Sequence, residues 1–190
     1  MSERVLDSYG PERSAHVQEI IGLSVELGKV ICIPDTAAAE QRDLKMLAER
    51  ARPDYVSPPP PQPRLGPGLW SAEAPGAGLL SLQAEVILDG KRGRFDDLIG
   101  FRFVVIARNA ETLGSISPAN RDALESVNAA LVHFGTDTNG LTDVSGAYKD
   151  WLDQLDCVAV FARPDFYLHG GARDAVELNE LLDSWRQAAF

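Results

Sequence analysis

The sequence has few of the residues on which redox chemistry depends. Its 190 residues include only two cysteines, Cys32 and Cys157, which lie far apart. Because no C-x-x-C pair exists, thiol–disulfide exchange of the thioredoxin kind is excluded. We interpret the two residues as buried, reduced thiols of a cytoplasmic protein, with a single long-range disulfide as the alternative.

The glycine motifs that bind nucleotides are missing as well. A dinucleotide fingerprint requires G-x-G-x-x-G between a strand and a helix, but the nearest approach, Gly76-Ala77-Gly78, has Ser81 in place of the third glycine. Neither Gly28-Lys29 nor Gly90-Lys91 is followed by the Ser or Thr of a phosphate loop. The G-x-S-x-G and H-E-x-x-H motifs are also absent. We therefore expect this chain alone to bind no cofactor.

Positive charge and long apolar runs are scarce. Lys and Arg number 18 against 28 Asp and Glu, which gives a formal net charge of −10. Nucleic acids and anionic membranes attract basic surfaces, so we expect neither as a partner. No apolar run approaches the roughly 18–20 residues that span a bilayer, and the first residues lack a signal-peptide layout. These features favour a cytoplasmic location.

Few residues remain as candidates for chemistry. The three histidines, His16, His133 and His169, have no second His or Cys at ligand spacing, so we interpret them as structural or surface residues. The pair Asp96-Asp97 could suggest an acid/base site, but adjacent residues on a strand point to opposite faces. A turn, or a cap for the next segment, is the favoured interpretation. The sequence thus predicts no catalytic, cofactor-binding or metal-binding residue.

Proline divides the chain. Seven of the twelve prolines lie between Pro53 and Pro67, and proline prevents both helix and sheet from continuing. We predict a helical segment over residues 1–52, an extended proline-rich linker over 53–68 and a folded domain over 69–190.

The helical segment carries one apolar stripe on each of two predicted helices. Two such helices cannot form a stable domain of about 50 residues alone. They must pack on the rest of the chain, on a second copy or on another protein. The interface candidates on the stripes are Val17, Ile20, Ile21, Leu27, Leu44 and Leu47.

The part beyond the linker has a mixed pattern that predicts an α/β domain. Strands are expected within 82–88, 101–107, 131–134, 157–162 and 166–169, and helices within 118–130, 144–155 and 176–185. Alternating strands and helices followed by a hairpin and a helix is the thioredoxin-like order. Arg163-Pro164-Asp165 is predicted as a tight turn between two strands, with a role in an interface as the alternative.

Several segments, in order, resemble the FAD-dependent aromatic hydroxylases, the class A flavoprotein monooxygenases, and most of all the 3-(3-hydroxyphenyl)propionate hydroxylase branch. The first, Leu6 to Arg13 with His16-Val17 after it, is similar to the family's "LDSYxxER…HV" segment. The later ones are Ala39 to Asp43, Pro63 to Gly68, Gln83 to Gly90, Asp96 to Gly100, the set Asp143, Gly146, Tyr148 and Trp151, and Phe161 to Tyr167.

The resemblance implies that the chain corresponds to the C-terminal third of such an enzyme. In that family the motifs that hold FAD lie upstream of the first segment, and the thioredoxin-like domain has lost its redox cysteines and contributes to subunit contacts. We therefore expect a chain that is non-catalytic by itself. It would form a dimer or another homo-oligomer, or dock on a flavoprotein hydroxylase subunit that supplies the FAD. The alternative is direct participation in aromatic hydroxylation by binding FAD or a phenolic substrate.

Overall fold

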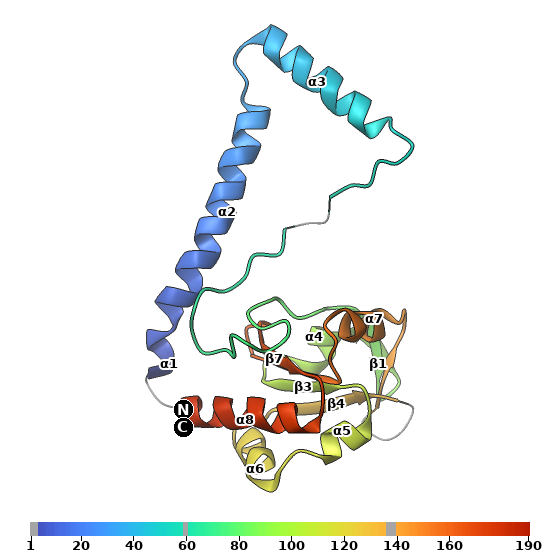
Figure 1. Ribbon diagram of the computed structural model, residues 1–190. Coiled ribbons are helices and arrows are strands. Elements are labelled where there is room, and N and C mark those ends of the chain that lie inside the picture. The colour runs from blue at the N-terminus through green and yellow to red at the C-terminus, as the bar shows by residue number, and fades with distance from the viewer. Residues whose placement is uncertain (1–3, 59–60, 136–139) are drawn as a thin grey trace.

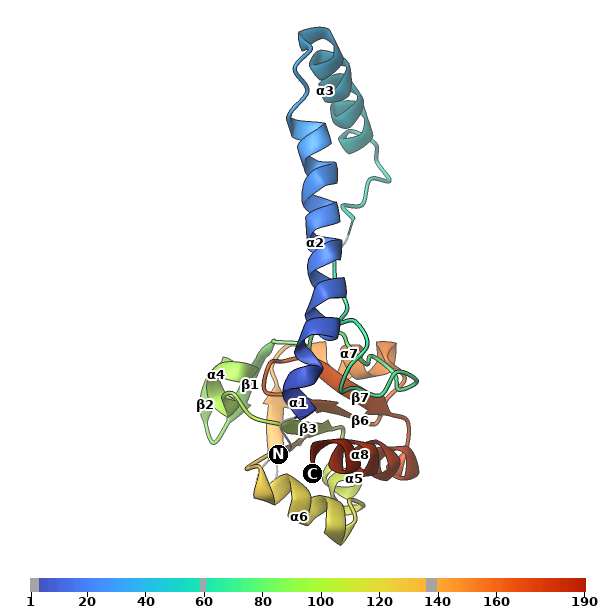
Figure 2. The same ribbon diagram turned by 90° about the vertical axis from the view of Figure 1, so that its left-hand side faces the viewer.

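The protein consists of a mixed α/β domain and a helical arm that extends from it. The computed structural model describes residues 4–58, 61–135 and 140–190. The arm comprises α1 (Arg4–Asp7), α2 (Tyr9–Ile31) and α3 (Thr36–Arg50). Figures 1 and 2 show that α2 extends away from the domain and that α3 lies at its far end, away from the sheet. The α/β fold class and the two leading helices are as the sequence predicts.

Helix α2 does not end at Gly28, although glycine often ends a helix, and it continues to Ile31. Gly28 is tolerated inside the helix, and Pro34 lies just beyond the end, where it blocks any continuation. Asp35 then caps α3, since its side chain accepts a hydrogen bond of 2.7 Å from the backbone N–H of Ala38.

The linker returns from the tip of the arm to the domain. Its described residues form neither helix nor strand, while residues 59 and 60 lie outside the described part. Figure 1 shows it descending from the end of α3 and approaching α2 only near the base of the arm, before it enters the domain. Among the described residues, no helix combines the length and the apolar character needed to cross a bilayer.

A seven-stranded sheet with the order β2-β1-β5-β4-β3-β6-β7 forms the centre of the domain. β4 runs parallel to both β3 and β5, and the other neighbours are antiparallel. The strands are β1 (Glu85–Leu88), β2 (Lys91–Arg94), β3 (Val104–Ala107), β4 (Ala130–Phe134), β5 (Gly140–Asp143), β6 (Ala159–Ala162) and β7 (Leu168–Ala172).

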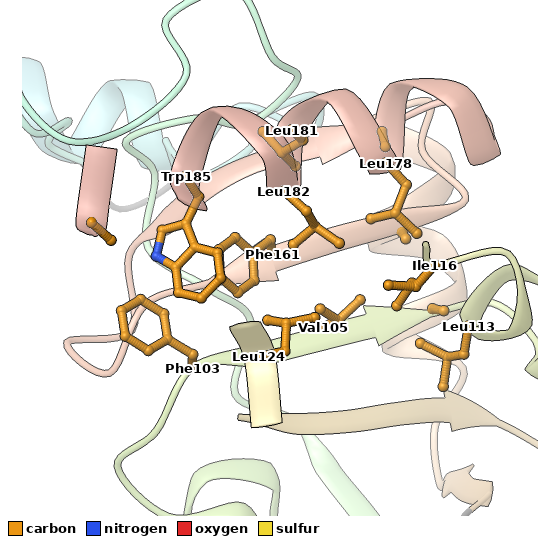
Figure 3. Close-up of a cluster of buried hydrophobic side chains, with 14 residues drawn as sticks. Phe103, Val105, Leu113, Ile116, Leu124, Phe161, Leu178, Leu181, Leu182 and Trp185 are labelled. Atoms are coloured by element: carbon orange, nitrogen blue, oxygen red, sulfur yellow. The ribbon is translucent and has the colours of Figure 1, made fainter. Parts of the chain in front are cut away.

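The sheet is covered on both faces because its central strands are apolar on both sides. Along β3 and the residue before it, Phe103 and Val105 face one cluster of buried side chains, while Val104 and Ile106 face another. The first cluster includes residues of α5 (Ala110–Gly114), α6 (Pro118–Ser126) and α8 (Ala175–Ala189), and Figure 3 shows α8 lying over it. The second includes residues of α4 (Phe95–Ile99) and α7 (Ala147–Gln154).

Several local predictions need correction. Strands β2 and β5 and the short helices α4 and α5 were not predicted, and Asp96-Asp97 lies in the first turn of α4. The strand expected within 166–169 is β7, which extends to Ala172 and includes Gly170-Gly171. A side chain there would collide with the segment over the strand, since a Cβ at Gly170 would lie 2.5 Å from the Ala74 methyl.

The cysteines are both free, so the disulfide alternative is wrong. Cys157 is buried, and burial raises the pKa of its thiol to about 11, which keeps it protonated and unreactive. Cys32 lies at the end of α2 and is exposed, contrary to the prediction of two buried thiols.

Candidate functional site

The base of the arm is joined to the domain by a buried ion pair. Glu12, in the first turn of α2, is only 2% exposed. Its two carboxylate oxygens each accept a hydrogen bond of 2.9 Å from the guanidinium of Arg163, and one also accepts a bond of 2.7 Å from the backbone N–H of Leu69. A bidentate pair with a third donor is the arrangement that offsets the cost of burying a carboxylate.

A tight turn presents Arg163 to the arm. The backbone carbonyl of Arg163 accepts a hydrogen bond of 3.0 Å from the N–H of Phe166, which confirms the predicted turn. Arg163 also donates bonds of 2.9 and 3.2 Å to Asp165, and Arg13 of α2 donates one of 3.1 Å to the same carboxylate. Burial alone would lower the pKa of Arg163, but the bonds and charges of Glu12 and Asp165 outweigh it and raise the pKa.

Contacts other than ion pairs complete the junction. The Tyr167 hydroxyl lies 3.0 Å from Nε2 of His16, and the guanidinium of Arg13 lies 4.9 Å from the centre of the Tyr167 ring. The returning linker also contacts α2, because the N–H of Gly66 donates a bond of 2.8 Å to the carbonyl of Glu12. A Cβ at Gly68 would collide with the Glu12 carboxylate, so only glycine fits at this position of the linker while Glu12 keeps its place. The base of the arm is therefore held at a defined angle.

A cavity of about 340 Å³ lies beside this ion pair. The start of the arm forms one side and the end of α8 the other. Its lining residues are mostly apolar or aromatic, and they include Leu6, Tyr9, Leu69, Phe103, His169 and Trp185.

His169 is the buried polar residue in this wall. It is 3% exposed, and its Nδ1 lies 3.1 Å from the carbonyl oxygen of Leu69. A carbonyl oxygen only accepts, so Nδ1 carries the hydrogen and Nε2 holds a lone pair. Nε2 is buried and has no hydrogen-bond partner among the described residues. Burial lowers the pKa of this imidazole to about 4, so the ring is neutral at pH 7.

The depressed pKa of His169 predicts a pH-dependent contribution to stability. Between the ordinary histidine pKa of about 6.5 and the folded value of about 4, the unfolded chain binds the extra proton, so the folded state loses stability as the pH falls through this window. Urea unfolding measures the free energy of unfolding of the wild type and of His169→Gln. We expect the difference between the two to decrease by about 2 kcal/mol, in disfavour of the wild type, when the pH is lowered from 7.5 to 5. A difference that stays constant over this range would show that His169 does not titrate this way.

The structure places the nine interface candidates in two groups. All six on the arm stripes are exposed, from 39% for Ile20 to 68% for Leu44. Arg163 and Asp165 join the arm to the domain within one chain, and Pro164 lines the cavity with them. Glu12 is the important residue that the sequence analysis did not name as a site residue, although it lies within the Leu6-to-Arg13 segment that resembles the family. Among the described residues, no group of three or more His, Cys, Asp or Glu side chains could hold a metal ion.

The fold and the junction together define a helical arm that is joined through a buried ion pair to an α/β domain. Residues 78–188 match the family model described as the HcaD C-terminal domain, and the chain belongs to this family. It is 34% identical over 183 residues to a probable NADH-specific resorcinol 4-hydroxylase of Rhodococcus jostii, covering 93% of this chain and 33% of that protein. The predicted resemblance to FAD-dependent aromatic hydroxylases is thus confirmed.

Other relatives agree. A 3-(3-hydroxy-phenyl)propionate/3-hydroxycinnamic acid hydroxylase of Burkholderia vietnamiensis is 28% identical over 97% of this chain and 38% of its own length. The flavin-dependent monooxygenase PieE, solved with FAD and substrate, matches 97% of this chain and 39% of its own with a TM-score of 0.57 at 20% identity. The structure of aklavinone-11 hydroxylase matches 96% of this chain and 35% of its own, with a TM-score of 0.59 at 18% identity. The chain spans little more than a third of the length of these proteins.

Proposed function

We propose that this chain is a docking region, non-catalytic by itself, whose arm packs against the flavin-binding part of an aromatic hydroxylase. The observation that carries the proposal is an arm with an apolar surface that is rigidly joined to the domain at its base and uncovered along its length. The large apolar side chains exposed on it are Leu6, Tyr9, Val17, Ile20, Ile21, Leu23, Val25, Leu27, Val30, Ile31, Leu44, Met46 and Leu47. An accumulation of exposed large apolar side chains on one part of a protein is a mark of an interface.

The relatives favour a flavin-binding body as the occupant of that surface. Each of those named above is about three times as long as the matched region, and the matches to solved structures extend over the arm as well as the domain. The additional two thirds of such a protein offer a body large enough to cover both helices. Specific interfaces bury about 800 Å² on each partner, and two helices with exposed apolar stripes can supply this area.

We further assign the centre of the domain to the thioredoxin-like group and place its boundaries at residues 69 and 190, with the linker at 53–68. Four strands, in the order β4-β3-β6-β7, support this assignment. Two are parallel and joined by a crossover that contains a helix, and the antiparallel pair β6-β7 is followed by α8.

Co-purification tests the docking proposal. The chain is expressed with the part of the Rhodococcus jostii hydroxylase that precedes the region matched by this chain. We expect a one-to-one complex that carries the visible absorbance of FAD. Ile20→Glu with Leu47→Glu would place two charges in the interface and weaken the complex about thirtyfold, the effect of losing a hot spot of about 2 kcal/mol. Gln18→Glu, at an exposed polar position on α2, adds one such charge and is the control for the charge itself.

The alternative occupant is a second copy of the chain. If light scattering finds a stable dimer that Ile20→Glu dissociates, and no complex forms with the flavoprotein part, the arm is a self-association surface and the docking proposal is wrong. Flavin absorbance on the chain in the absence of any flavoprotein would contradict the non-catalytic assignment itself.

A further inference from the structure

One side of helix α2 faces the domain at the base of the arm. Glu12 and Arg13 form ion pairs with a turn of the domain, and Nε2 of His16 lies 3.0 Å from the Tyr167 hydroxyl. Residues three and four positions apart on an α-helix lie on the same face. Glu12, Arg13 and His16 therefore define the side of α2 that is turned towards the domain.

The same side of α2 continues beyond the domain as an apolar stripe. Ile20, Leu23 and Leu27 follow His16 at steps of four, three and four residues, so they lie on the same face of the helix. We call these three residues the inner stripe. They are 39%, 37% and 51% exposed, and Figures 1 and 2 show α2 extending past the domain. The lower part of this face is thus covered by the domain, while its upper part is apolar and exposed.

An exposed apolar side chain of the domain points towards the same angle. Leu80 and Tyr167 form an isolated antiparallel bridge, and residues directly opposite each other in such a pair point to the same face. The Tyr167 ring on that face contacts the arm, since its centre lies 4.9 Å from the guanidinium of Arg13. Leu80, which is 54% exposed, therefore lies on the side of the domain where the arm is attached.

We propose that the flavin-binding body lies in the angle between α2 and the domain, where it contacts the inner stripe and Leu80 at the same time. The inference rests on the proposed docking function and names the side of the arm that the partner covers. Apolar side chains on both walls of one angle leave water together when a single body fills it.

The relatives favour the flavin-binding body over a second copy of this chain as the occupant. In them the region matched by this chain includes both arm and domain and is only about a third of the protein. Arm and domain therefore occur there together with a body about twice their size. Such a body has enough surface to meet both walls of the angle and to bury the roughly 800 Å² per partner of a specific interface.

Leu23→Glu and Val25→Glu distinguish the two sides of the helix. Val25 follows His16 by nine residues, or two and a half turns, so it lies on the side of α2 away from the domain. Both side chains are exposed and apolar, and each variant adds one charge. The full chain is titrated calorimetrically with the part of the Rhodococcus jostii hydroxylase that precedes the matched region, loaded with FAD. We expect Leu23→Glu to weaken binding at least tenfold and Val25→Glu to stay within twofold.

An equal or larger loss of affinity in Val25→Glu would place the partner on the other side of the arm and overturn the inference. Leu23→Met, which keeps an apolar side chain of similar volume, should bind within twofold of the wild type. If Leu23→Met loses as much affinity as Leu23→Glu, the added charge in the angle is not the cause, and the inference is again wrong.

Leu80→Glu tests whether the partner reaches the domain. Val176→Glu is the matched control, because Val176 is 66% exposed in the first turn of α8. It lies about 18 Å along that helix from Ala188, which lines the cavity at the start of the arm. We expect at least a tenfold loss for Leu80→Glu and a change within twofold for Val176→Glu. Wild-type affinity in Leu80→Glu would overturn the inference, whereas the docking of the arm, tested by Ile20→Glu with Leu47→Glu, would stand.

Hydroxyl-radical labelling gives a readout that needs no variant. Leu23 and Leu80 should be protected in the complex, while Val25 and Val176 should be labelled as in the free chain. Labelling of Leu23 and Leu80 that does not change in the complex would contradict the inference. A dimer of the chain that Leu23→Glu dissociates, found by light scattering, would assign the angle to a second copy. If the wild type does not bind the flavoprotein part at all, the docking function fails and the inference fails with it.

Discussion

Glu12→Gln is expected to loosen the arm from the domain at a cost of about 3 kcal/mol. The substitution removes one partner of a buried, bidentate pair and leaves the Arg163 guanidinium with a single carboxylate, Asp165. Losing one partner of a buried pair costs about 3–5 kcal/mol, and the remaining contact to Asp165 places the effect at the lower end. The lost interaction joins the arm to the domain and is not part of the domain core. The arm can therefore detach while the domain remains folded.

Amide hydrogen exchange measures this detachment directly. The N–H of Leu69 donates to the Glu12 carboxylate and is protected only while the arm is docked. Its exchange should accelerate more than a hundredfold in Glu12→Gln, since 1.4 kcal/mol corresponds to a factor of ten. Glu26→Gln is the matched control, because Glu26 pairs with Lys29 on the same helix with both side chains about two-thirds exposed. We expect a change below about 0.5 kcal/mol there. Equal effects of the two substitutions would contradict a structural role for the buried pair.

Phe161→Ala is expected to destabilise the domain itself by about 3–5 kcal/mol. Phe161 is fully buried at the centre of β6. Its ring lies 5.1 Å from that of Trp185, 5.6 Å from that of Phe103 and 5.6 Å from that of His169, so the truncation leaves a cavity surrounded by rings that cannot all move inwards.

Urea unfolding followed by circular dichroism measures this loss. Phe101→Ala is the control, because Phe101 is 82% exposed although it contacts the ring of Phe166. A surface change of this kind should stay within about 0.5 kcal/mol. If the two variants unfold at the same urea concentration, the cluster of Figure 3 is not the stabilising core of the domain.

The central strands and the longer helices of the domain could be predicted from the sequence because their signals are local. The segment around Val104–Ala107 is apolar on successive residues, as a strand buried on both faces must be. Strand β2, with the sequence Lys-Arg-Gly-Arg, has no such signal. It is a strand only because it pairs with β1 at the edge of the sheet, where charged side chains remain in water.

At Arg163-Pro164-Asp165 the sequence predicted the local conformation but not the contact that the turn makes. Proline and aspartate at these positions were enough to predict the turn. The partner of Arg163, however, is Glu12, 151 positions earlier, and neither residue carries a local pattern that points to the other. The same holds for His169, whose low pKa results from burial and whose free nitrogen depends on which segments pack around it.

The sequence by itself determined the α/β class, the proline-rich break between arm and domain, and the family, because each depends on residues that are near neighbours in the chain or on motifs in order. Only the tertiary structure decided that the two apolar stripes stay uncovered, that Glu12 joins the arm to the domain, and that a cavity lies beside this ion pair. Burial, ion pairing and cavity volume depend on which distant segments meet in space, and that is settled when the whole chain packs.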